Sequence, residues 1–261
     1  QTITGTLTLA GNSITNRLLV QSNTLGTART LTAATVTLSN VDLMDITGAG
    51  AGSWDLSAIT GKSGDCGGNT SITFTTAAAQ YWHVDTGSWS NSEKWFLASN
   101  GLGGAGRVPL PQDNVFFDAS SIDNAGQTIT ADMPRKGKDI TFTGVAACTL
   151  TESITTSIYG SYTLAASVTY NSYEVYARGR GSHTITSAGT TIFVLFIAAP
   201  SGTYTLQDTL TTGDEIYIDN GTFTSNNQVM NVWRLVSQNS TSPTINLGSS
   251  VITVDFDSTG T

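Results

Sequence analysis

Hydrophobic and polar residues alternate along much of the chain with a period of two. In "TITGTLTL" (2–9), this period places Ile3, Leu7 and Leu9 on one face of an extended segment and threonines on the other. The same alternation recurs in "TLTAATVTL" (30–38), "SITFTT" (71–76), "QTITA" (127–131), "DITFT" (139–143), "HTITS" (183–187) and "VITVDF" (251–256). A period of two indicates a half-buried β-strand, and no segment of about ten or more residues holds a helical period. The sequence therefore predicts an all-β protein.

The arrangement of these segments favours a solenoid. They recur about every 8–12 residues and are separated by Gly, Asn, Ser or Asp, which fits a sandwich, a barrel or a solenoid. Asn-Gly, a strong hairpin signal, occurs only at 100–101 and 220–221. Many strands are short, and both ends of the chain look like strands inside an array without a polar cap. We therefore predict parallel β-helix or β-solenoid segments, with antiparallel β-sandwich domains as the alternative.

One stretch interrupts the alternation and divides the chain. Between residues 77 and 120 the threonine pattern stops, and three of the five tryptophans occur together with a glycine cluster and two prolines. We predict a first β-solenoid segment at 1–76, a Trp- and Gly-rich junction or clasp at 77–120, and a second β-solenoid segment at 121–261.

Composition narrows the range of partners. Only 11% of residues are charged and the net charge is -8, so a nucleic-acid backbone is a poor partner. We expect the basic stretches "RKGK" (135–138) and "RGR" (178–180) to be solvated turns. The longest apolar run, "TIFVLFIAA" (191–199), is shorter than the ~20 residues of a membrane span. It is expected to be a strand buried on both faces, and we predict neither a nucleic-acid nor a membrane partner.

The cysteines and acidic turns give no strong cofactor signal. Cys66 and Cys148 match no metal spacing and are expected to be reduced and buried, although a disulfide stays possible. The loops "GDCGGN" (64–69) and "QDNVFFD" (112–118) each offer two side chains for Ca²⁺, fewer than a self-sufficient site needs. Hydrogen-bonded turns explain them better, so we expect no cofactor and assign no metal ligand, with Ca²⁺ as a weak possibility.

The tryptophans of the junction admit two interpretations. Aromatic faces stack on sugars, and neighbouring Asp and Asn side chains hydrogen-bond sugar hydroxyls. A glycan site of this kind would use Trp89, Trp95, Asp85 and Asn91. Alternatively, the rings pack down and close the open end of a coil array as a structural clasp. That clasp would comprise Trp82, Trp89, Trp95, Pro109, Asp113 and Asp118. The mixture of Trp with turn-forming Gly and Pro favours the clasp.

Enzymatic chemistry has weaker signals. "GLGGAG" (101–106) matches a dinucleotide-binding pattern, but Pro109 and Pro111 forbid the helix that this motif requires. Polysaccharide cleavage needs two convergent carboxylates. The candidate sets are Asp214 and Glu215 with Asp219, Asp255 with Asp257, and Asp42 with Asp45. Acidic turns are common in acidic proteins, so we assign no catalytic residue and predict that the chain is not an enzyme.

Two consecutive segments, 46–76 and 81–120, resemble a recurrent module of tailed-phage structural proteins of the β-helical, tail-fibre-like kind, which also occurs in bacterial surface proteins. The matching residues are Tyr81-Trp82, Gly87-Ser88-Trp89, Trp95, the glycines from Gly101 to Gly106, Val108-Pro109, and Asp113 to Asp118. The chain departs from this pattern because "SITF" (71–74) lacks a Trp and because Pro111 precedes Gln112.

The resemblance implies a non-enzymatic structural or adhesion module of a phage virion, associated with the tail or a fibre. It implies a location on the virion or an extracellular surface. The partners expected from it are other virion proteins or further copies of the chain, as in a homotrimer, and a host-surface glycan. The alternative function is a carbohydrate-binding module or a polysaccharide depolymerase of the β-helical tailspike type.

Overall fold

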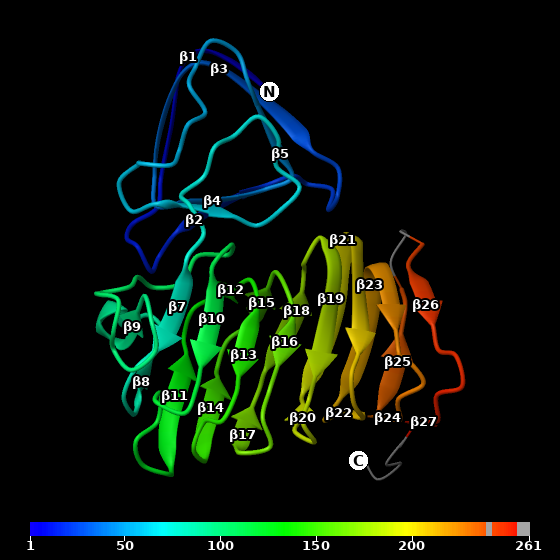
Figure 1. Cartoon of the computed structure of the whole chain (residues 1–261). Coiled ribbons are helices and arrows are strands. Elements are labelled where there is room, and N and C mark those ends of the chain that lie inside the picture. The colour runs from blue at the N-terminus through cyan, green and yellow to red at the C-terminus, as the bar shows by residue number, and fades with distance from the viewer. Residues whose placement is uncertain (239–241, 255–261) are drawn as a thin grey trace, which may run out of the picture. The chain divides into compact units, whose positions relative to one another are not determined.

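The computed structural model describes residues 1–238 and 242–254, and it is all-β (Figure 1). In this part of the chain, the one helical element is the three-residue 3-10 turn η1 (Ser92–Lys94). Short parallel strands stack coil on coil as a β-solenoid, with about 11 turns in all. The predicted solenoid is confirmed, and the antiparallel sandwich is wrong. Among the described strands, the one antiparallel pair joins β7 (Ala79–Trp82) to β9 (Trp95–Phe96).

The chain forms two compact units. The first contains Gln1–Ala78 and Leu110–Asp113, and the second contains Ala79–Pro109 and Asn114–Thr261. The stretch 77–120 therefore contributes residues to both units.

The first unit consists of six parallel strands in two sheets. One sheet has the order β1-β3-β5 and the other the order β2-β4-β6, so each coil gives one strand to each sheet. The strands are β1 (Thr2–Ala10), β2 (Leu18–Gln21), β3 (Arg29–Ser39), β4 (Val41–Met44), β5 (Ile46–Ala49) and β6 (Ser63–Asp65). Aliphatic side chains such as Val41, Leu43 and Ile46 point inward and pack with Trp54. The period-two alternation thus supplies the core of each coil.

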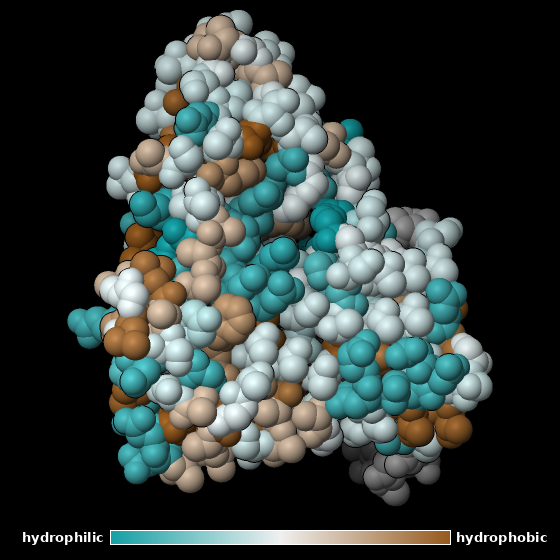
Figure 2. Space-filling model, in the orientation of Figure 1, coloured by the Kyte–Doolittle hydropathy of each residue, from teal (hydrophilic) through white to brown (hydrophobic). Residues whose placement is uncertain are grey.

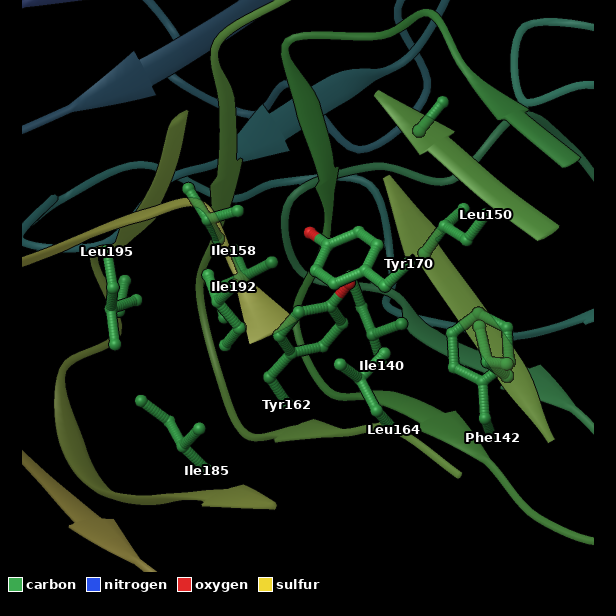
Figure 3. Packing of buried hydrophobic residues seen from close by; sticks show 14 of the residues in the cluster. Ile140, Phe142, Leu150, Ile158, Tyr162, Leu164, Tyr170, Ile185, Ile192 and Leu195 are labelled. Atoms are coloured by element: carbon green, nitrogen blue, oxygen red, sulfur yellow. The ribbon is translucent and has the colours of Figure 1, made fainter. Parts of the chain in front are cut away.

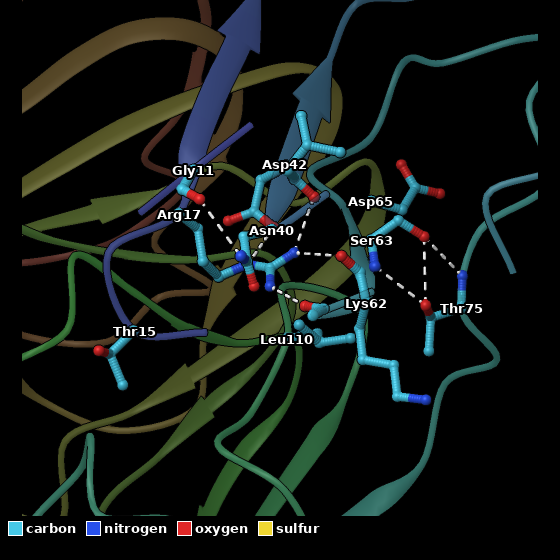
Figure 4. Close-up of polar contacts among 12 residues, drawn as sticks. Gly11, Thr15, Arg17, Asn40, Asp42, Lys62, Ser63, Asp65, Thr75 and Leu110 are labelled. Atoms are coloured by element: carbon cyan, nitrogen blue, oxygen red, sulfur yellow. Dashed lines mark hydrogen bonds and ion pairs between the residues drawn. The ribbon is translucent and has the colours of Figure 1, made fainter. Parts of the chain in front are cut away.

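A buried ion pair links successive coils of the first unit (Figure 4). The Arg17 guanidinium donates to Asp42 Oδ1 at 2.7 Å, to the Val41 carbonyl at 2.7 Å and to the Gly61 carbonyl at 2.6 Å. The carboxylate of Asp42 is fully buried. The Arg17 guanidinium compensates this negative charge, which would otherwise destabilise the folded chain.

The segment Leu110–Asp113 adds to the first unit through Gln112. The carboxamide nitrogen of Gln112 donates to the carbonyl oxygens of Ser63 and Thr75, each at 2.9 Å, and its oxygen accepts from the Asp65 amide at 2.9 Å. These three hydrogen bonds satisfy backbone groups of the third coil, where β6 pairs with no strand beyond β4 in the described part of the chain.

The second unit is a solenoid with three faces. The first face contains β7, β10 (Asn114–Phe117), β13 (Ile140–Phe142), β16 (Tyr162–Thr163), β19 (Gly181–Thr186) and β26 (Thr244–Asn246). The second contains β8 (Gly87–Ser88), β11 (Gln127–Ala131), β14 (Cys148–Glu152), β17 (Val168–Asn171), β20 (Thr191–Ile192), β22 (Leu210–Thr212), β24 (Met230–Val232) and β27 (Ile252–Val254). The third contains β12 (Arg135–Gly137), β15 (Thr156–Ile158), β18 (Glu174–Ala177) and β25 (Arg234–Val236).

Two long strands connect the third face to the first. The beginning of β21 (Val194–Leu206) pairs with β18 and its end pairs with β19. The beginning of β23 (Glu215–Thr224) likewise pairs with β25 and its end with β26. Each strand therefore turns a corner of the solenoid without a loop.

A coil of the second unit takes about 20 residues, since Cys148 pairs with Val168 and Thr191 pairs with Thr211. Side chains consequently align in columns along the solenoid. Val175, Leu195 and Ile216 form one inward column, and all three are fully buried. Figure 3 shows the interior with Ile140, Leu150, Tyr162 and Tyr170 packed against one another. Many outward positions hold threonine, which favours extended backbone without adding apolar surface.

The basic stretch 135–138 is not a solvated turn, and that expectation is wrong. Lys136 points into the solenoid and is fully buried. Its ammonium group donates to Glu152 Oε1 and lies 4.7 Å from the ring centroid of Tyr162. The second oxygen of Glu152 accepts from the Thr156 hydroxyl at 3.1 Å. Burial lowers the pKa of Lys136, and the negative charge of Glu152 opposes that change.

The segment 191–199 is not one strand buried on both faces. Residues 191–192 form β20 on the second face, and β21 starts at Val194 on the third face. Phe193 lies at the corner between them and is exposed. The cysteine prediction is confirmed, since Cys66 and Cys148 are free and buried.

Because three tyrosines are buried in the second unit, we expect the folded chain to lose stability at alkaline pH. Burial raises the pKa of Tyr204 and raises those of Tyr162 and Tyr170 well above their usual value near 10. Above about pH 10 the unfolded chain releases these protons while the folded chain keeps them, so stability falls by about 1.4 kcal/mol per pH unit for each tyrosine. The ionisation of Lys136 changes stability in the opposite direction. Because burial lowers its pKa in the folded chain, stability rises with pH, but only below the ordinary lysine pKa of 10.5.

Thermal unfolding of the second unit, followed between pH 9 and 11.5, tests this expectation. The Tyr204→Phe variant is expected to be less stable at pH 9, because the Tyr204 hydroxyl accepts from the Gly179 amide and donates to the Gly160 carbonyl. It is also expected to lose stability less steeply above pH 10. Equal slopes for the variant and the unmodified protein would contradict the assignment.

Candidate functional site

The three tryptophans of the predicted junction lie together in the core of the second unit. Trp82, Trp89 and Trp95 are each at most 1% exposed. The ring centroid of Trp95 lies 5.1 Å from that of Trp82 and 5.0 Å from that of Trp89, both in edge-to-face geometry. Phe117 packs against all three rings and stacks on Phe142 of the next coil at 4.2 Å. The cluster is continuous with the interior of the solenoid.

Backbone interactions hold this tryptophan cluster at the first coil of the second unit. The antiparallel strand β9 pairs with β7 and so covers the strand edge opposite β10. The indole nitrogen of Trp95 donates to the Trp89 carbonyl at 2.8 Å, and that of Trp82 donates to the Asp85 carbonyl at 3.2 Å. Rings this deeply buried offer no face to a sugar in this structure.

The polar residues of the two interpretations serve local turns. Asn91 accepts from the Glu93 amide at 3.0 Å and caps η1, while Asp85 adopts a left-handed backbone conformation with φ of 67°. Asp118 accepts from the Ser120 amide at 2.9 Å. The other two residues of the proposed clasp are Pro109, which is buried in the second unit, and Asp113, which accepts from the Ala78 and Leu110 amides in the first.

Exposed aromatic residues instead lie at one corner of the solenoid. At the corner between the second and third faces, successive coils place Tyr173, Phe193, Asp214 and Trp233 in register. The Asp214 amide donates to the Phe193 carbonyl at 2.8 Å, and the Trp233 amide donates to the Asp214 carbonyl at 3.1 Å. The three aromatic side chains are 46%, 43% and 38% exposed. We call these four residues the corner column.

A cleft of about 500 Å³ opens in this column between Phe193 and Trp233. Its lining also includes Gly213 and Asp214 from the coil between the two rings, and Thr211 and Asn231 from β22 and β24. A β-carbon on Gly213 would lie 3.0 Å from Cδ2 of Phe193. The space beside the Phe193 ring therefore depends on the absence of a side chain at this position.

The rings of the corner column differ from the other outward aromatics. Tyr176, Phe196 and Tyr217 stack on one another along the third face, with centroid distances of 4.2 and 4.5 Å. Their faces are thus occupied by each other. Among the described residues, Phe193 and Trp233 stack on no other ring, and the Trp233 ring has only the Arg234 guanidinium over it, 5.0 Å from the centroid.

The two carboxylates next to the cleft, those of Asp214 and Glu215, differ in their polar partners. The buried carboxylate of Glu215 forms an ion pair with Arg234 through one oxygen and accepts a hydrogen bond from the Tyr217 hydroxyl on the other. By contrast, Oδ1 of Asp214 is shielded from solvent and has no hydrogen-bond partner in the described part of the chain. Asp214 is accordingly the acidic group that gives the cleft its charge.

The remaining carboxylates of the candidate sets have their own surroundings, and Asp42 and Asp45 belong to the first unit. Asp42 is paired with Arg17, and Asp45 accepts from the Gly26 amide at 2.8 Å. Burial raises the pKa of Asp219, opposed by Arg178. Asp255 and Asp257 lie outside the described residues.

The loops considered for Ca²⁺ use their carboxylates in turns. Asp65 Oδ1 accepts from the Gly67 amide at 2.9 Å and from the Asn69 side chain at 2.7 Å. Within residues 1–238 and 242–254, no group of three or more His, Cys, Asp or Glu side chains is placed to hold a metal ion.

Sequence reasoning missed the corner column because it followed the density of tryptophans. Phe193 was hidden inside an apolar run, and Trp233 stands alone in the sequence. The available signal was their spacing. Tyr173 and Phe193 are one 20-residue coil apart, and Phe193 and Trp233 each directly follow a short strand.

Comparison with known proteins gives no match for the chain among protein-family models, curated proteins or solved structures. Across the described residues, no helix has the length and apolar character required to span a membrane.

Proposed function

We propose that the chain is a non-enzymatic structural and adhesion module of a phage virion, associated with the tail or a fibre, which contacts a host-surface glycan. The resemblance in segments 46–76 and 81–120 supports the virion assignment. The observation that carries the adhesion role is the cleft between Phe193 and Trp233, where aromatic faces and polar groups lie side by side on a rigid scaffold. Sugar-binding sites combine these two features.

The outer surface agrees with an extracellular or particle location. Figure 2 shows hydrophobic residues in small groups among pale and hydrophilic ones on the visible face. Threonines form outward columns such as Thr184, Thr205 and Thr224. A surface of neutral polar groups with few charges suits contact with hydroxyl-rich polymers, because it forms hydrogen bonds without a large cost of desolvating ions.

A second candidate function is a polysaccharide depolymerase. One observation favours it: Asp214 presents a carboxylate with an unpartnered oxygen beside the cleft. The neighbouring carboxylate, Glu215, is held by Arg234 and Tyr217 and is not free to act as its partner. A two-carboxylate mechanism therefore lacks its second group here.

Binding and cleavage can be measured in one experiment. The purified chain is incubated with surface polysaccharides from bacterial strains that tailed phages infect, and both retention on the polymer and release of reducing ends are recorded. We expect reversible retention with no release of reducing ends. The absence of retention on every polysaccharide would contradict the adhesion role, and release of reducing ends would favour the depolymerase. Immunogold labelling of phage particles whose genome encodes the chain tests the virion location.

A further inference from the structure

We propose that the cleft between Phe193 and Trp233 binds a short segment of an uncharged polysaccharide, which lies along the solenoid axis over the corner column. This inference rests on the proposed adhesion function and names its site and ligand class. It uses residues from four successive coils of the second unit, and all of them lie on the same corner.

The corner column defines the direction and length of the ligand. Its four residues follow the stacking of the coils, and neighbouring parallel strands lie about 4.8 Å apart. Tyr173 and Trp233 are separated by three coil steps, which corresponds to about 14 Å. A short oligosaccharide of about three units covers this length, whereas a monosaccharide covers only the gap between Phe193 and Trp233.

The gap itself has the size and chemistry for one sugar ring. Phe193 and Trp233 are two coil steps apart, or about 10 Å, with Gly213 and Asp214 in the intervening coil. A sugar ring between them contacts an aromatic side chain on either side. Thr211 and Asn231, which pair in adjacent strands, supply hydroxyl and amide groups along the same cleft. These are the donors and acceptors that orient sugar hydroxyls.

The charge of the cleft selects against acidic polymers. The Glu215 carboxylate is compensated by Arg234, but the Asp214 carboxylate has one oxygen without a partner. A uronic or sialic acid placed here would bring a second negative charge close to Asp214 in a partly desolvated site, where repulsion is stronger than in water. Hydroxyl groups of a neutral sugar bring no such charge and instead donate to the Asp214 carboxylate that lines the cleft. The chain's net charge of -8 acts in the same direction.

Intrinsic fluorescence reports on this site selectively. All five tryptophans lie in the described part of the chain, and Trp233 alone among them is exposed, since the other four are at most 7% exposed. Acrylamide therefore quenches mainly Trp233. The probes are neutral cello-, manno- and N-acetylchito-oligosaccharides of one to six units, with oligogalacturonides and oligosialic acids as acidic counterparts.

We expect at least one neutral series to bind saturably and to protect Trp233 from quenching. Affinity should rise up to about three units and then level off, because the column spans about 14 Å. The acidic series should not bind. Asp214→Asn should keep the neutral affinity within about threefold and should weaken the exclusion of acidic oligosaccharides, because the repelling charge is gone.

Variants locate the binding site. Trp233→Ala and Phe193→Ala should each reduce neutral affinity about tenfold, measured by calorimetry, which is the loss expected for one aromatic contact. Gly213→Val keeps both rings and fills the space beside Phe193, so it should block binding even if Phe193→Ala disturbs the fold. Leu97→Ala, at an exposed apolar residue on another part of the second unit, is the matched control and should leave binding unchanged.

The outcomes separate this inference from the proposed function. Retention of a bacterial polysaccharide that survives in folded Trp233→Ala and Gly213→Val variants would overturn the site while leaving the adhesion role intact. Preferential binding of the acidic series would overturn the ligand class. If the unmodified chain binds no oligosaccharide and no bacterial polysaccharide, the adhesion function itself fails.

Discussion

Replacing Lys136 by Met is expected to lower the free energy of unfolding of the second unit by about 3–5 kcal/mol. Lys136 is fully buried, and its ammonium group is the cation that faces the Glu152 carboxylate. A methionine fills similar space but supplies no cation to the Glu152 carboxylate, which still accepts from the Thr156 hydroxyl. An uncompensated charge in the interior of the solenoid carries the desolvation cost without the attraction that offsets it.

A double variant separates charge from packing at this position. Lys136→Met/Glu152→Leu removes both charges and should recover most of the lost stability, because apolar replacement of a buried ion pair is often neutral or stabilising. Urea unfolding measures each value. A single variant as stable as the unmodified protein would show that the pair carries no such energy.

Replacing Trp95 by Ala is expected to cost about 3–5 kcal/mol, the range for truncating a buried aromatic residue. Trp95 contacts both Trp82 and Trp89, and its indole donates to the Trp89 carbonyl. Because each coil is stabilised mainly by its neighbours, the loss of stability should be greatest in the first coils of the second unit. Amide hydrogen exchange should therefore accelerate in β7 and β10 more than in β24.

Trp95→Phe and Leu97→Ala provide the comparison for this variant. The phenylalanine keeps most of the ring volume and loses the indole hydrogen bond, so an intermediate cost is expected. Leu97 is exposed, and its replacement should change stability by at most about 0.5 kcal/mol. If Trp95→Ala matched Leu97→Ala in stability and exchange, the tryptophan cluster would not be what closes the first coil.

The solenoid could be predicted from sequence because its signals are local. The alternation of threonine with aliphatic residues predicts strands, and the scarcity of Asn-Gly disfavours hairpins. The register could not be predicted. Thr184, Thr205 and Thr224 align in one column, although the two intervals between them differ in length. The corners between faces differ in length from coil to coil. The strands therefore align regularly in space, although the number of residues per coil varies.

Lys136 shows where local reasoning fails. A lysine inside "RKGK" has the composition of a solvated turn, and its partner Glu152 lies 16 residues later. No local pattern marks that pair. It becomes visible only when coils of about 20 residues bring β12, β14 and β15 around one interior.

The candidate site shows a similar limit. The sequence drew attention to the tryptophans of the stretch 77–120. However, burial determines which aromatic side chains can contact a ligand. Trp82, Trp89 and Trp95 are buried against one another and against Phe117, whereas Phe193 and Trp233 are exposed because the chain turns a corner at each of them. Exposure at a corner depends on the coil geometry, which residue type alone does not reveal.

The most direct test of the adhesion cleft is a crystal structure of the chain with a neutral oligosaccharide that binds it. We expect an intact sugar chain over the corner column, with one ring between Phe193 and Trp233 and a hydroxyl donating to the Asp214 carboxylate. A sugar bound elsewhere on the second unit, with this cleft empty, would contradict the proposed site, and a cleaved sugar would contradict the non-enzymatic role.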